Sequence, residues 1–331
     1  MNLRNKQWVL ASRPKGQADE SNFRMVETDV PALRDGQVLI KVQYLSLDPY
    51  MRGRMDESKS YASPHPLDAV MIGGTVGDVV ESRNDTYVPG DIVTGMGGWQ
   101  QYYITDGTGL RKVDASHIPA SAYLGVVGMP GVTAWYGLLQ IGKPKDGETV
   151  VVSAASGAVG SVVGQLAKLH GCRAVGFAGG TAKCQYVVDE LGLDACINYK
   201  ADDAREAFKA ATPNGVDVVF ENVGGPVFDL ALARMNAFGR VALCGLIAGY
   251  NGQDIALQNV RSILVNRLTL EGFIVSEHTD LWPAALKALG RHVAQGTLKY
   301  RESIALGIDS APQAFMGLLK GENFGKQLVK M

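Results

Sequence analysis

The stretch SAASGAVGSVVG (153–164) places glycines at positions 157, 160 and 164 among small and β-branched residues. It overlaps the end of ETVVVSA (148–154), an apolar run typical of a buried strand. It also opens SVVGQLAKLHG (161–171), where apolar residues recur at helical spacing and a glycine closes the run. A glycine-rich turn between a buried strand and a helix indicates the first unit of an alternating β/α series.

The same alternation continues downstream of this turn. TAKCQYVVDELG (181–192) is typical of a helix opened by Thr181. The strand-like runs are CRAVGFA (172–178), DACINY (194–199), VDVVFENV (216–223), GRVALCG (239–245) and LTLEGFIV (268–275). This pattern predicts an α/β fold of the Rossmann type, a doubly wound parallel sheet with right-handed crossovers.

The sequence upstream of about residue 125 has a different pattern of apolar and turn residues. Short apolar runs alternate there with turn signals, and no long helical period is present. These runs are KQWVLAS (6–12), FRMVETDV (23–30), QVLIKVQYLSL (37–47) and GDIVTGM (90–96). The pattern predicts a compact, mostly β domain. With 331 residues, the chain is long enough for two domains.

The composition, 46% hydrophobic and 20% charged, is that of a soluble globular protein. A net charge of −1 provides neither a basic surface for nucleic acid nor a patch for an anionic membrane. No run approaches the ~20 apolar residues of a spanning helix, and the N-terminus carries no apolar leader. We therefore expect no nucleic-acid partner, no membrane and a cytoplasmic location.

The glycine-rich turn has the spacing of a phosphate cradle. Against the pattern GxGxxG it reads Ala155-x-Gly157-x-x-Gly160, with alanine in the first position. Gly157 would let the backbone approach a pyrophosphate, Gly160 would let the helix pack closely on the strand, and the helix N-terminus would offer N–H groups. A plain tight turn is the alternative interpretation, but the surrounding β/α series favours a dinucleotide site.

The second strand runs into FAGGTAKCQY (177–186), where an NAD-binding chain usually carries an acidic residue for the ribose hydroxyls. Here Ala178, Gly179 and Gly180 are small and neutral, and Lys183 follows in the first turn of the next helix. Without a carboxylate, a 2′-phosphate is not repelled, and Lys183 can pair with it beside the helix dipole. The pattern favours NADP(H), with a solvated surface lysine as the alternative.

Patterns typical of metal sites and catalytic nucleophiles are missing from the sequence. The histidines are scattered without HxxxH, the cysteines form no CxxC pair, and no GxSxG occurs. We therefore expect neither a catalytic zinc nor a disulfide framework. Tyr50, Tyr61 and Tyr250 lie in turn-rich stretches, where each is either a hydrogen-bond or proton donor or only a rim or core aromatic.

Several motifs together resemble one known family. They are NKQWVLASRPKG (5–16), SLDPYMRGRM (46–55), GMPGVTAWYGL (128–138), ASGAVGSVVGQLAK (155–168), FENVGG (220–225), CGLIAGYN (244–251), EGFIV (271–275) and MGLLKGENFGKQLVK (316–330). Over nearly its whole length the chain resembles a zinc-independent medium-chain dehydrogenase/reductase of the prostaglandin reductase and alkenal double-bond reductase group, close to bacterial NADPH-dependent curcumin reductases. The resemblance implies a GroES-like, β-rich catalytic domain of residues 1–125 with 297–331, and a Rossmann NADP-binding domain of residues 126–296.

The resemblance also implies an activity, the NADPH-dependent reduction of the C=C bond of an α,β-unsaturated ketone or aldehyde. Hydride goes to the β-carbon and a proton to the α-carbon. Tyr50 would face the substrate, Tyr250 would lie near the nicotinamide ribose, and the enzyme would be a homodimer. The implied cofactor-binding residues are Gly157, Ala158, Val159, Gly160, Lys183, Tyr199, Asn222, Cys244, Gly245, Leu246, Ile247, Tyr250, Phe273, Ile274, Val275 and Asn323.

One departure from the family pattern leaves the proton donor open. Some relatives carry a tyrosine shortly before the EGF-type strand, where this chain has Val265. Tyr50, Tyr61, a cofactor hydroxyl and water remain candidates. An NADPH-dependent quinone reductase and a non-catalytic NADPH-binding sensor also remain open, although the intact DPYMRGRM (48–55) argues against a protein that only binds the cofactor.

Overall fold

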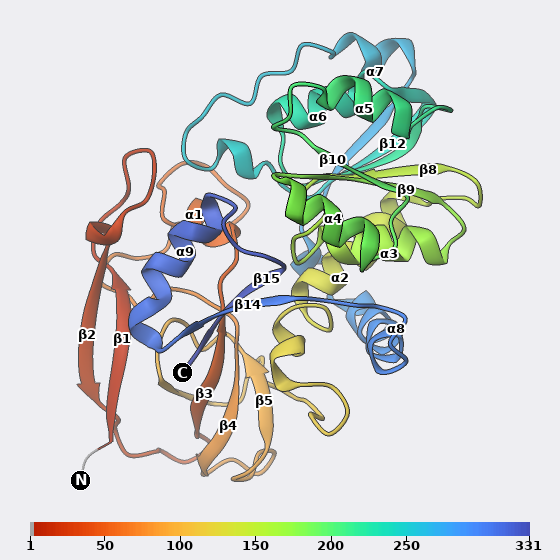
Figure 1. Cartoon of the computed structure of the whole chain (residues 1–331). Helices are drawn as coiled ribbons and strands as arrows, with labels where there is room; N and C mark the ends of the chain where they lie inside the picture. Colours follow the sequence, from red (N-terminus) through yellow and green to blue (C-terminus); the bar gives the residue numbers. More distant parts are fainter. Residues whose placement is uncertain (1–2) are drawn as a thin grey trace. The chain divides into compact units, whose positions relative to one another are not determined.

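In the computed structural model, residues 3–331 are described and fall into two compact units. One unit joins the chain up to Leu124 to Glu302–Met331, and the other runs from Gly125 to Arg301. Figure 1 shows that the first unit consists largely of strands, whereas helices flank the sheet of the second. The predicted class, a β-rich domain with a Rossmann-type doubly wound sheet, is confirmed.

The second unit is built on a parallel sheet with the strand order β10-β9-β8-β11-β12-β13. Its strands are β8 (Thr149–Val152), β9 (Arg173–Ala178), β10 (Ala195–Asn198), β11 (Val216–Glu221), β12 (Met235–Leu243) and β13 (Thr269–Gly272). Every residue of β8 is buried, as expected for a continuous apolar run covered on both faces. The strand order reverses between β8 and β11, and doubly wound sheets bind ligands at the carboxyl ends beside such a switch point.

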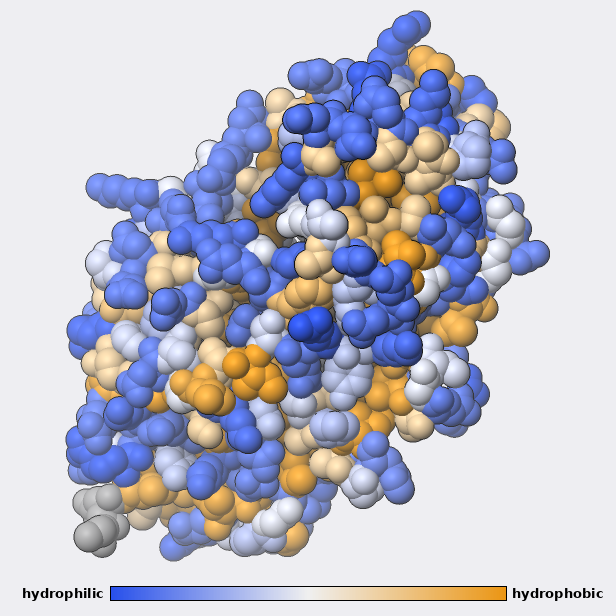
Figure 2. All heavy atoms as spheres, in the orientation of Figure 1, coloured by the Kyte–Doolittle hydropathy of each residue, from blue (hydrophilic) through white to orange (hydrophobic). Residues whose placement is uncertain are grey.

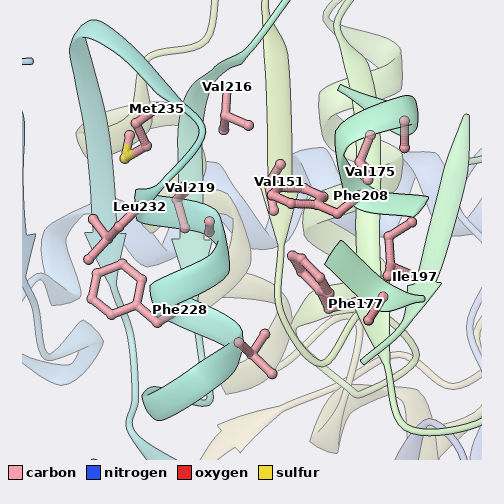
Figure 3. Packing of buried hydrophobic residues seen from close by; sticks show 14 of the residues in the cluster. Val151, Val175, Phe177, Ile197, Phe208, Val216, Val219, Phe228, Leu232 and Met235 are labelled. Atoms are coloured by element: carbon pink, nitrogen blue, oxygen red, sulfur yellow. The ribbon is translucent and has the colours of Figure 1, made fainter. Parts of the chain in front are cut away.

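Helices cover both faces of this sheet. Figure 1 shows α3 (Gly160–Leu169) and α4 (Thr181–Asp189) on one face and α5 (Ala204–Ala211) and α6 (Gly225–Leu232) on the other. Beneath α5 and α6, side chains from five strands and both helices pack into a core, with the Phe177 and Phe208 rings 4.7 Å apart between centroids (Figure 3). This apolar layer fixes the helices and therefore the turns that precede them.

The remaining helical segments of this unit are shorter or lie outside the β/α alternation. They are α2 (Met129–Tyr136), the π-helical turn η3 (Gly137–Gly142), the 3₁₀ turns η4 (Ile247–Gly249), η5 (Val275–Glu277) and η6 (Thr279–Leu281), α7 (Arg261–Val265) and α8 (Trp282–Ala294). Helix α2 packs against α8 and α3.

The first unit contains a sheet with the order β14-β15-β3-β4-β5-β7, in which β6 also pairs with β3. A separate hairpin is formed by β1 (Arg4–Leu10) and β2 (Phe23–Asp29). The sheet strands are β3 (Val38–Ser46), β4 (Thr75–Ser82), β5 (Ile92–Gly95), β6 (Tyr102–Thr105), β7 (Arg111–Lys112), β14 (Glu302–Leu306) and β15 (Lys326–Lys330). Its helical segments are η1 (Glu20–Asn22), α1 (Tyr50–Arg54), η2 (Ala120–Leu124), η7 (Ile308–Ser310) and α9 (Ala311–Leu319).

The core of this unit is aromatic at its centre. The ring of Trp99 is stacked on Phe23 with centroids 5.3 Å apart and meets Phe315 of α9 edge-on at 5.4 Å. Residues from the two ends of the chain therefore share one core. In this way β15, which lies between β14 and β3, and α9 are held in the first unit.

The surface of the chain is mixed in polarity. Figure 2 shows polar side chains over most of the visible face, with apolar residues in smaller groups between them. Within residues 3–331, none of the helices combines the length and the apolar character needed to cross a bilayer.

Candidate active site

The turn after β8 is held by its own backbone and by β9. The Ala155 N–H donates to the Phe177 carbonyl at 2.9 Å, and the Gly157 N–H donates to the Ala154 carbonyl at 2.9 Å. A Cβ added at Gly160 would stand 2.3 Å from the Ala154 oxygen, whereas one at Gly157 would stand 3.2 Å from it. Gly160 is therefore required for the contact between α3 and the turn, while Gly157 lies in the half-exposed part of the turn.

This turn leads into a helix that can receive an anion. Helix α3 has 10 residues, and its N-cap residue, Val159, makes no side-chain capping bond within the described residues. The first N–H groups of an α-helix lack intrahelical partners, and the helix dipole adds positive potential there. Together with Gly157 and Ala158, this end of α3 has the geometry of a phosphate cradle.

A cluster of cationic and phenolic groups surrounds the end of β9. Lys183 is half-buried in the first turn of α4, where burial and then neighbouring Lys200 lower its pKa. Tyr199 follows β10, and a Cβ at Gly179 would lie 3.0 Å from its Oη. The Lys200 Nζ lies 5.8 Å from the centroid of the Tyr199 ring. Lys200 was missed from the sequence, although the neighbouring carboxyl ends of β9 and β10 would have indicated it.

A buried carboxylate organises the turn after β11. Glu221, the last residue of β11, is 1% exposed. Its Oε1 accepts hydrogen bonds from the Ser153 hydroxyl at 2.9 Å and from the Val223 and Gly224 N–H groups at 2.6 Å each. Burial raises the pKa of this carboxyl to about 7, and the three hydrogen bonds oppose the shift. Glu221 thus ties the turn after β8 to the turn after β11 across the switch point.

Asn222 extends this connection. Its Nδ2 donates to the Ser153 carbonyl at 2.8 Å, and its backbone N–H donates to the Ser153 hydroxyl at 2.7 Å. The Asn222 carbonyl accepts from the Ile247 N–H at 3.2 Å. The sequence pointed to Asn222 but not to Glu221 or Ser153. A charged residue that closes a buried strand beside the switch point was the available signal.

The turn after β12 is attached to the same carboxylate-bearing residue. The Cys244 and Gly245 N–H groups donate to the Glu221 carbonyl at 2.9 and 3.1 Å. Burial, followed by the Glu221 charge, raises the pKa of the Cys244 thiol to about 12, so this thiol is not a nucleophile at neutral pH. A Cβ at Gly245 would lie 3.4 Å from the Tyr250 Oη, which places that phenol against the turn.

The turn after β13 is mainly apolar. Phe273 is 9% exposed and packs with Tyr136 at 5.3 Å and Phe220 at 6.2 Å between ring centroids. Val275 is also buried, and Ile274 precedes it in extended conformation. LTLEGFIV was expected to be one strand, but β13 ends at Gly272 and residues from Val275 onward form a 3₁₀ turn. The strand is therefore shorter than expected, and the chain leaves the sheet after Gly272.

Parallel topology thus brings the predicted cofactor residues of the second unit to one edge of the sheet. They follow the carboxyl ends of β8, β9, β10, β11, β12 and β13, in a sheet whose strands all run the same way. Asn323 belongs to the first unit. It lies in the turn between α9 and β15, where its Nδ2 donates to the Gly325 carbonyl at 2.7 Å.

Two of the three candidate tyrosines lie in the first unit. Tyr50 is the first residue of α1 and is half-buried, and Tyr61 is 58% exposed in the loop between α1 and β4. Burial raises the pKa of Tyr50 well above its ordinary value, and the Asp48 carboxylate and the Tyr61 phenol add to this shift. The structure therefore brings Tyr50 and Tyr61 close together, and Tyr50 stays protonated at neutral pH.

Val265 occupies the position at which some relatives carry a tyrosine. It is the last residue of α7 and is 50% exposed. Its isopropyl group can neither donate nor accept a proton. No hydroxyl at this position therefore takes part in the chemistry.

A metal does not fit the described side chains. Across residues 3–331, no three His, Cys, Asp or Glu side chains gather in a group able to hold a metal ion. Of the four cysteines, which are all free, Cys172 and Cys184 are buried.

Comparison with known proteins gives matches over both units. Residues 6–113 match a family described as the N-terminal domain of oxidoreductase, and residues 158–291 match one described as zinc-binding dehydrogenase. The second description names zinc, but the described residues lack a ligand set for it.

Individual relatives align over almost the whole chain. NADPH-dependent curcumin reductase of Escherichia coli is 47% identical over 99% of this chain and 97% of its own length. Prostaglandin reductase 1 of Rattus norvegicus is 43% identical over 98% of each. The crystal structure of CurA from Vibrio vulnificus in complex with NADPH superposes with a TM-score of 0.94 at 45% identity, covering 98% of this chain and 99% of that one. The chain belongs to the medium-chain dehydrogenase/reductase family, in the group that contains the curcumin and prostaglandin reductases.

Proposed function

We propose that the protein is an NADPH-dependent reductase of the C=C bond of α,β-unsaturated ketones and aldehydes. The observation that carries this proposal is the edge of the parallel sheet, where a phosphate-type turn and the Lys183–Tyr199–Lys200 cluster occur together without an acidic residue at Ala178–Gly180. The names of the curcumin and prostaglandin reductases support the substrate class.

The second unit provides the cofactor-binding side in this proposal. Gly157 and the N-terminus of α3 bind the pyrophosphate, and Lys183 with Tyr199 binds the 2′-phosphate. Asn222, Cys244–Ile247 and Phe273–Val275 line the remainder of the cofactor. Bound NADPH supplies the hydride that reaches the β-carbon of the substrate.

The first unit provides the substrate side. Tyr50 and Tyr61 donate hydrogen bonds to the carbonyl oxygen, where negative charge develops in the enolate. Tyr250 belongs to the cofactor side, near the nicotinamide ribose. Because its pKa is raised, Tyr50 is a poor acid but a lasting hydrogen-bond donor. It therefore stabilises the enolate oxygen, and the α-proton comes from Tyr61, a cofactor hydroxyl or water.

The domain limits follow from this division of work. We assign cofactor binding to residues 126–296 and the substrate side to residues 1–125 with 297–331.

A homodimer belongs to the same proposal, because β13 is an edge strand and α7 beside it leaves Leu264 79% exposed. The four free cysteines favour a reducing, cytoplasmic compartment. Light scattering measures the subunit number, and a monomer at micromolar concentration would contradict the dimer.

The test of the activity follows the hydride. NADPH deuterated at the transferable position is incubated with an enone, an enal, a curcumin-like diketone and a quinone, and the products are analysed by NMR. Deuterium at the β-carbon of a saturated ketone is expected. An allylic alcohol as the main product, or turnover of the quinone alone, would overturn the proposal.

A further inference from the structure

The segment that leads into α1 is held at several points in the first unit. The Ser46 N–H donates to the Gly74 carbonyl at 2.8 Å, and the Leu47 N–H donates to the Gln327 carbonyl at 3.2 Å. The Asp48 carbonyl accepts from the Met51 N–H at 3.1 Å, which closes the first turn of α1. Tyr50 follows Asp48 by two residues, so the position of Asp48 restricts the backbone position from which the Tyr50 side chain extends.

A buried lysine lies against this segment. Lys326 begins β15 and is 4% exposed. Its Nζ donates to the Leu47 carbonyl at 2.6 Å, to the Asp48 Oδ1 at 3.1 Å and to the Gln327 carbonyl at 3.1 Å. The three ammonium protons therefore have three acceptors, and one of these acceptors is the charged Asp48.

Both oxygens of the Asp48 carboxylate accept a hydrogen bond. Its Oδ2 accepts from the Ser46 hydroxyl, and its side chain is 8% exposed. Burial lowers the pKa of Lys326, and the nearby Asp48 and Glu302 carboxylates partly offset that shift. Lys326, Asp48 and Ser46 thus form a closed polar network inside the β-rich unit.

A buried ion pair of this kind adds little net stability compared with apolar residues in its place. The loss of hydration of two buried charges offsets most of their attraction, and apolar residues of similar volume often stabilise a fold equally well. Directed hydrogen bonds instead fix the atoms that they join. Here they join β15, the end of β3 and the first turn of α1.

We propose that Lys326 is a positioning residue for the reaction, which acts through Asp48 to hold Tyr50 toward the carbonyl oxygen of the substrate. This inference rests on the proposed function and adds a role to residues that do not touch substrate themselves. A shift of about 1 Å in a catalytic group lowers the rate on the order of 100-fold, so loss of this tether should appear in kcat more than in KM.

A double-mutant cycle tests the connection between Lys326 and Tyr50. The full-length variants Lys326→Met, Tyr50→Phe and the double variant are compared in kcat and KM for an enone at saturating NADPH. Lys326→Met alone should lower kcat about 10- to 100-fold. In the Tyr50→Phe background the same change should lower kcat less than about threefold, because the hydroxyl that it positions is already absent. Independent, multiplicative effects would overturn the inference.

Two further variants separate positioning from folding. Asp48→Asn keeps a hydrogen-bond acceptor and leaves no unpaired buried carboxylate, so it replaces Lys326→Met in the cycle if that variant is unstable. Glu302→Gln is the matched control, since it removes a half-buried carboxylate of β14 that interacts with Lys326 and lies outside the segment before α1 in the chain. Its kcat should remain within about twofold of wild type, and NADPH affinity should be unchanged in all variants. A loss of kcat in Glu302→Gln equal to that in Lys326→Met would overturn the inference.

A readout without turnover keeps the test independent of the proposed function. With 3-fluorotyrosine at position 50, the ¹⁹F signal should be single and sharp in wild type and should broaden or split in Lys326→Met and Asp48→Asn. An unchanged signal in both variants would overturn the positioning role even if the wild type reduced no enone. A wild type without enone reduction but with the expected ¹⁹F change would overturn only the proposed reaction and Tyr50's part in it.

Discussion

At the scale of single residues, Glu221 links structure to pH. Its carboxyl is buried at the end of β11, and burial raises its pKa to about 7. In an unfolded chain a glutamate has a pKa of about 4.3, so the native state binds this proton more tightly. The stability contributed by the proton is complete below about pH 4 and is lost as the pH rises to about 7.

Replacing Glu221 by Gln should remove this pH dependence. The free energy of unfolding of wild type should fall more steeply between pH 5 and pH 7 than that of Glu221→Gln, by at most about 1.4 kcal/mol per pH unit. Urea unfolding at several pH values measures the difference. Glu206→Gln, an exposed change on α5, is the control and should run parallel to wild type. Parallel curves for Glu221→Gln and wild type would contradict the expectation.

The residues at the end of β9 should determine the choice of cofactor. Since a charged hydrogen bond contributes about 1.5–3 kcal/mol, Lys183 and Tyr199 together should give NADPH a preference on the order of 100-fold or more over NADH in kcat/KM. Lys183→Ala should reduce the preference by weakening NADPH alone. Gly179→Asp should go further, because the carboxylate repels the phosphate and accepts from ribose hydroxyls. Ala178 is 2% exposed and is the less suitable position for an acid.

Equal use of NADH and NADPH by wild type, measured as kcat/KM for each, would contradict this prediction. It would mean that the absence of an acidic residue after β9 does not indicate which cofactor is bound. Lys200→Ala extends the comparison, since Lys200 lies beside the same phenol. It should weaken NADPH less than Lys183→Ala does, because Lys200 interacts with the site through the Tyr199 ring.

The tyrosine hydroxyls should contribute to transition-state binding. If each phenol acts as proposed, Tyr50→Phe and Tyr250→Phe should each lose one hydrogen bond made in the transition state, which costs about 1–3 kcal/mol, or roughly 5- to 150-fold in kcat/KM. Tyr87→Phe is the control, because this buried phenol donates to the Leu110 carbonyl inside the β-rich unit. Wild-type rates in both active-site variants would make these residues ordinary rim aromatics.

At the scale of the secondary-structure elements, the glycines of the turn after β8 separate stability from binding. A methyl at Gly160 collides with the Ala154 carbonyl, so Gly160→Ala should lose about 1–3 kcal/mol of unfolding free energy. A methyl at Gly157 would stand 3.2 Å from the Ala154 oxygen, a milder contact, and would occupy the approach of the pyrophosphate. Gly157→Ala should therefore lose less stability than Gly160→Ala and lose on the order of tenfold in NADPH affinity. Thermal unfolding and fluorescence titration measure both quantities, and equal stabilities would contradict the assignment.

Sequence reasoning recovered those elements whose pattern is local. The apolar runs of β8, β9 and β11 and the helical period of α3 are visible in the chain itself, and so are the turns between them. It missed β4, whose sequence TVGDVVES mixes glycine and charge. The structure explains the glycine, since a Cβ at Gly77 would lie 2.2 Å from the Lys41 carbonyl of β3. Helix α1 was also missed, because 5 residues are too short to show a period.

The candidate site was predictable to the same extent. Glycine spacing and the missing acidic residue led to the prediction of Gly157, Gly160 and Lys183, because these signals lie within single turns of the chain. Roles for Tyr199, Asn222 and the segment after β12 came from the family resemblance alone. The tether between Lys326 and Asp48 joins positions 278 residues apart, so no local pattern could reveal it.

At the scale of the whole molecule, activity should not depend on a metal. The described residues contain no ligand cluster, and the segment before α1 is held by Lys326 and Asp48 instead. Dialysis against a strong chelator should leave kcat/KM unchanged within assay error, about 20% of the value for the untreated enzyme. Elemental analysis before and after dialysis is the control. Stoichiometric zinc whose removal abolishes activity would contradict this.

The return of the chain to its first unit has a consequence for synthesis on the ribosome. Strand β15 pairs with both β3 and β14, so the sheet of the first unit stays incomplete until residues 302–331 have been translated. The Rossmann unit, Gly125–Arg301, is one continuous segment that can fold as soon as it emerges. The nascent chain can therefore fold its middle before its beginning, and during that interval the edge of β3 that β15 later covers is open to pairing with neighbouring chains.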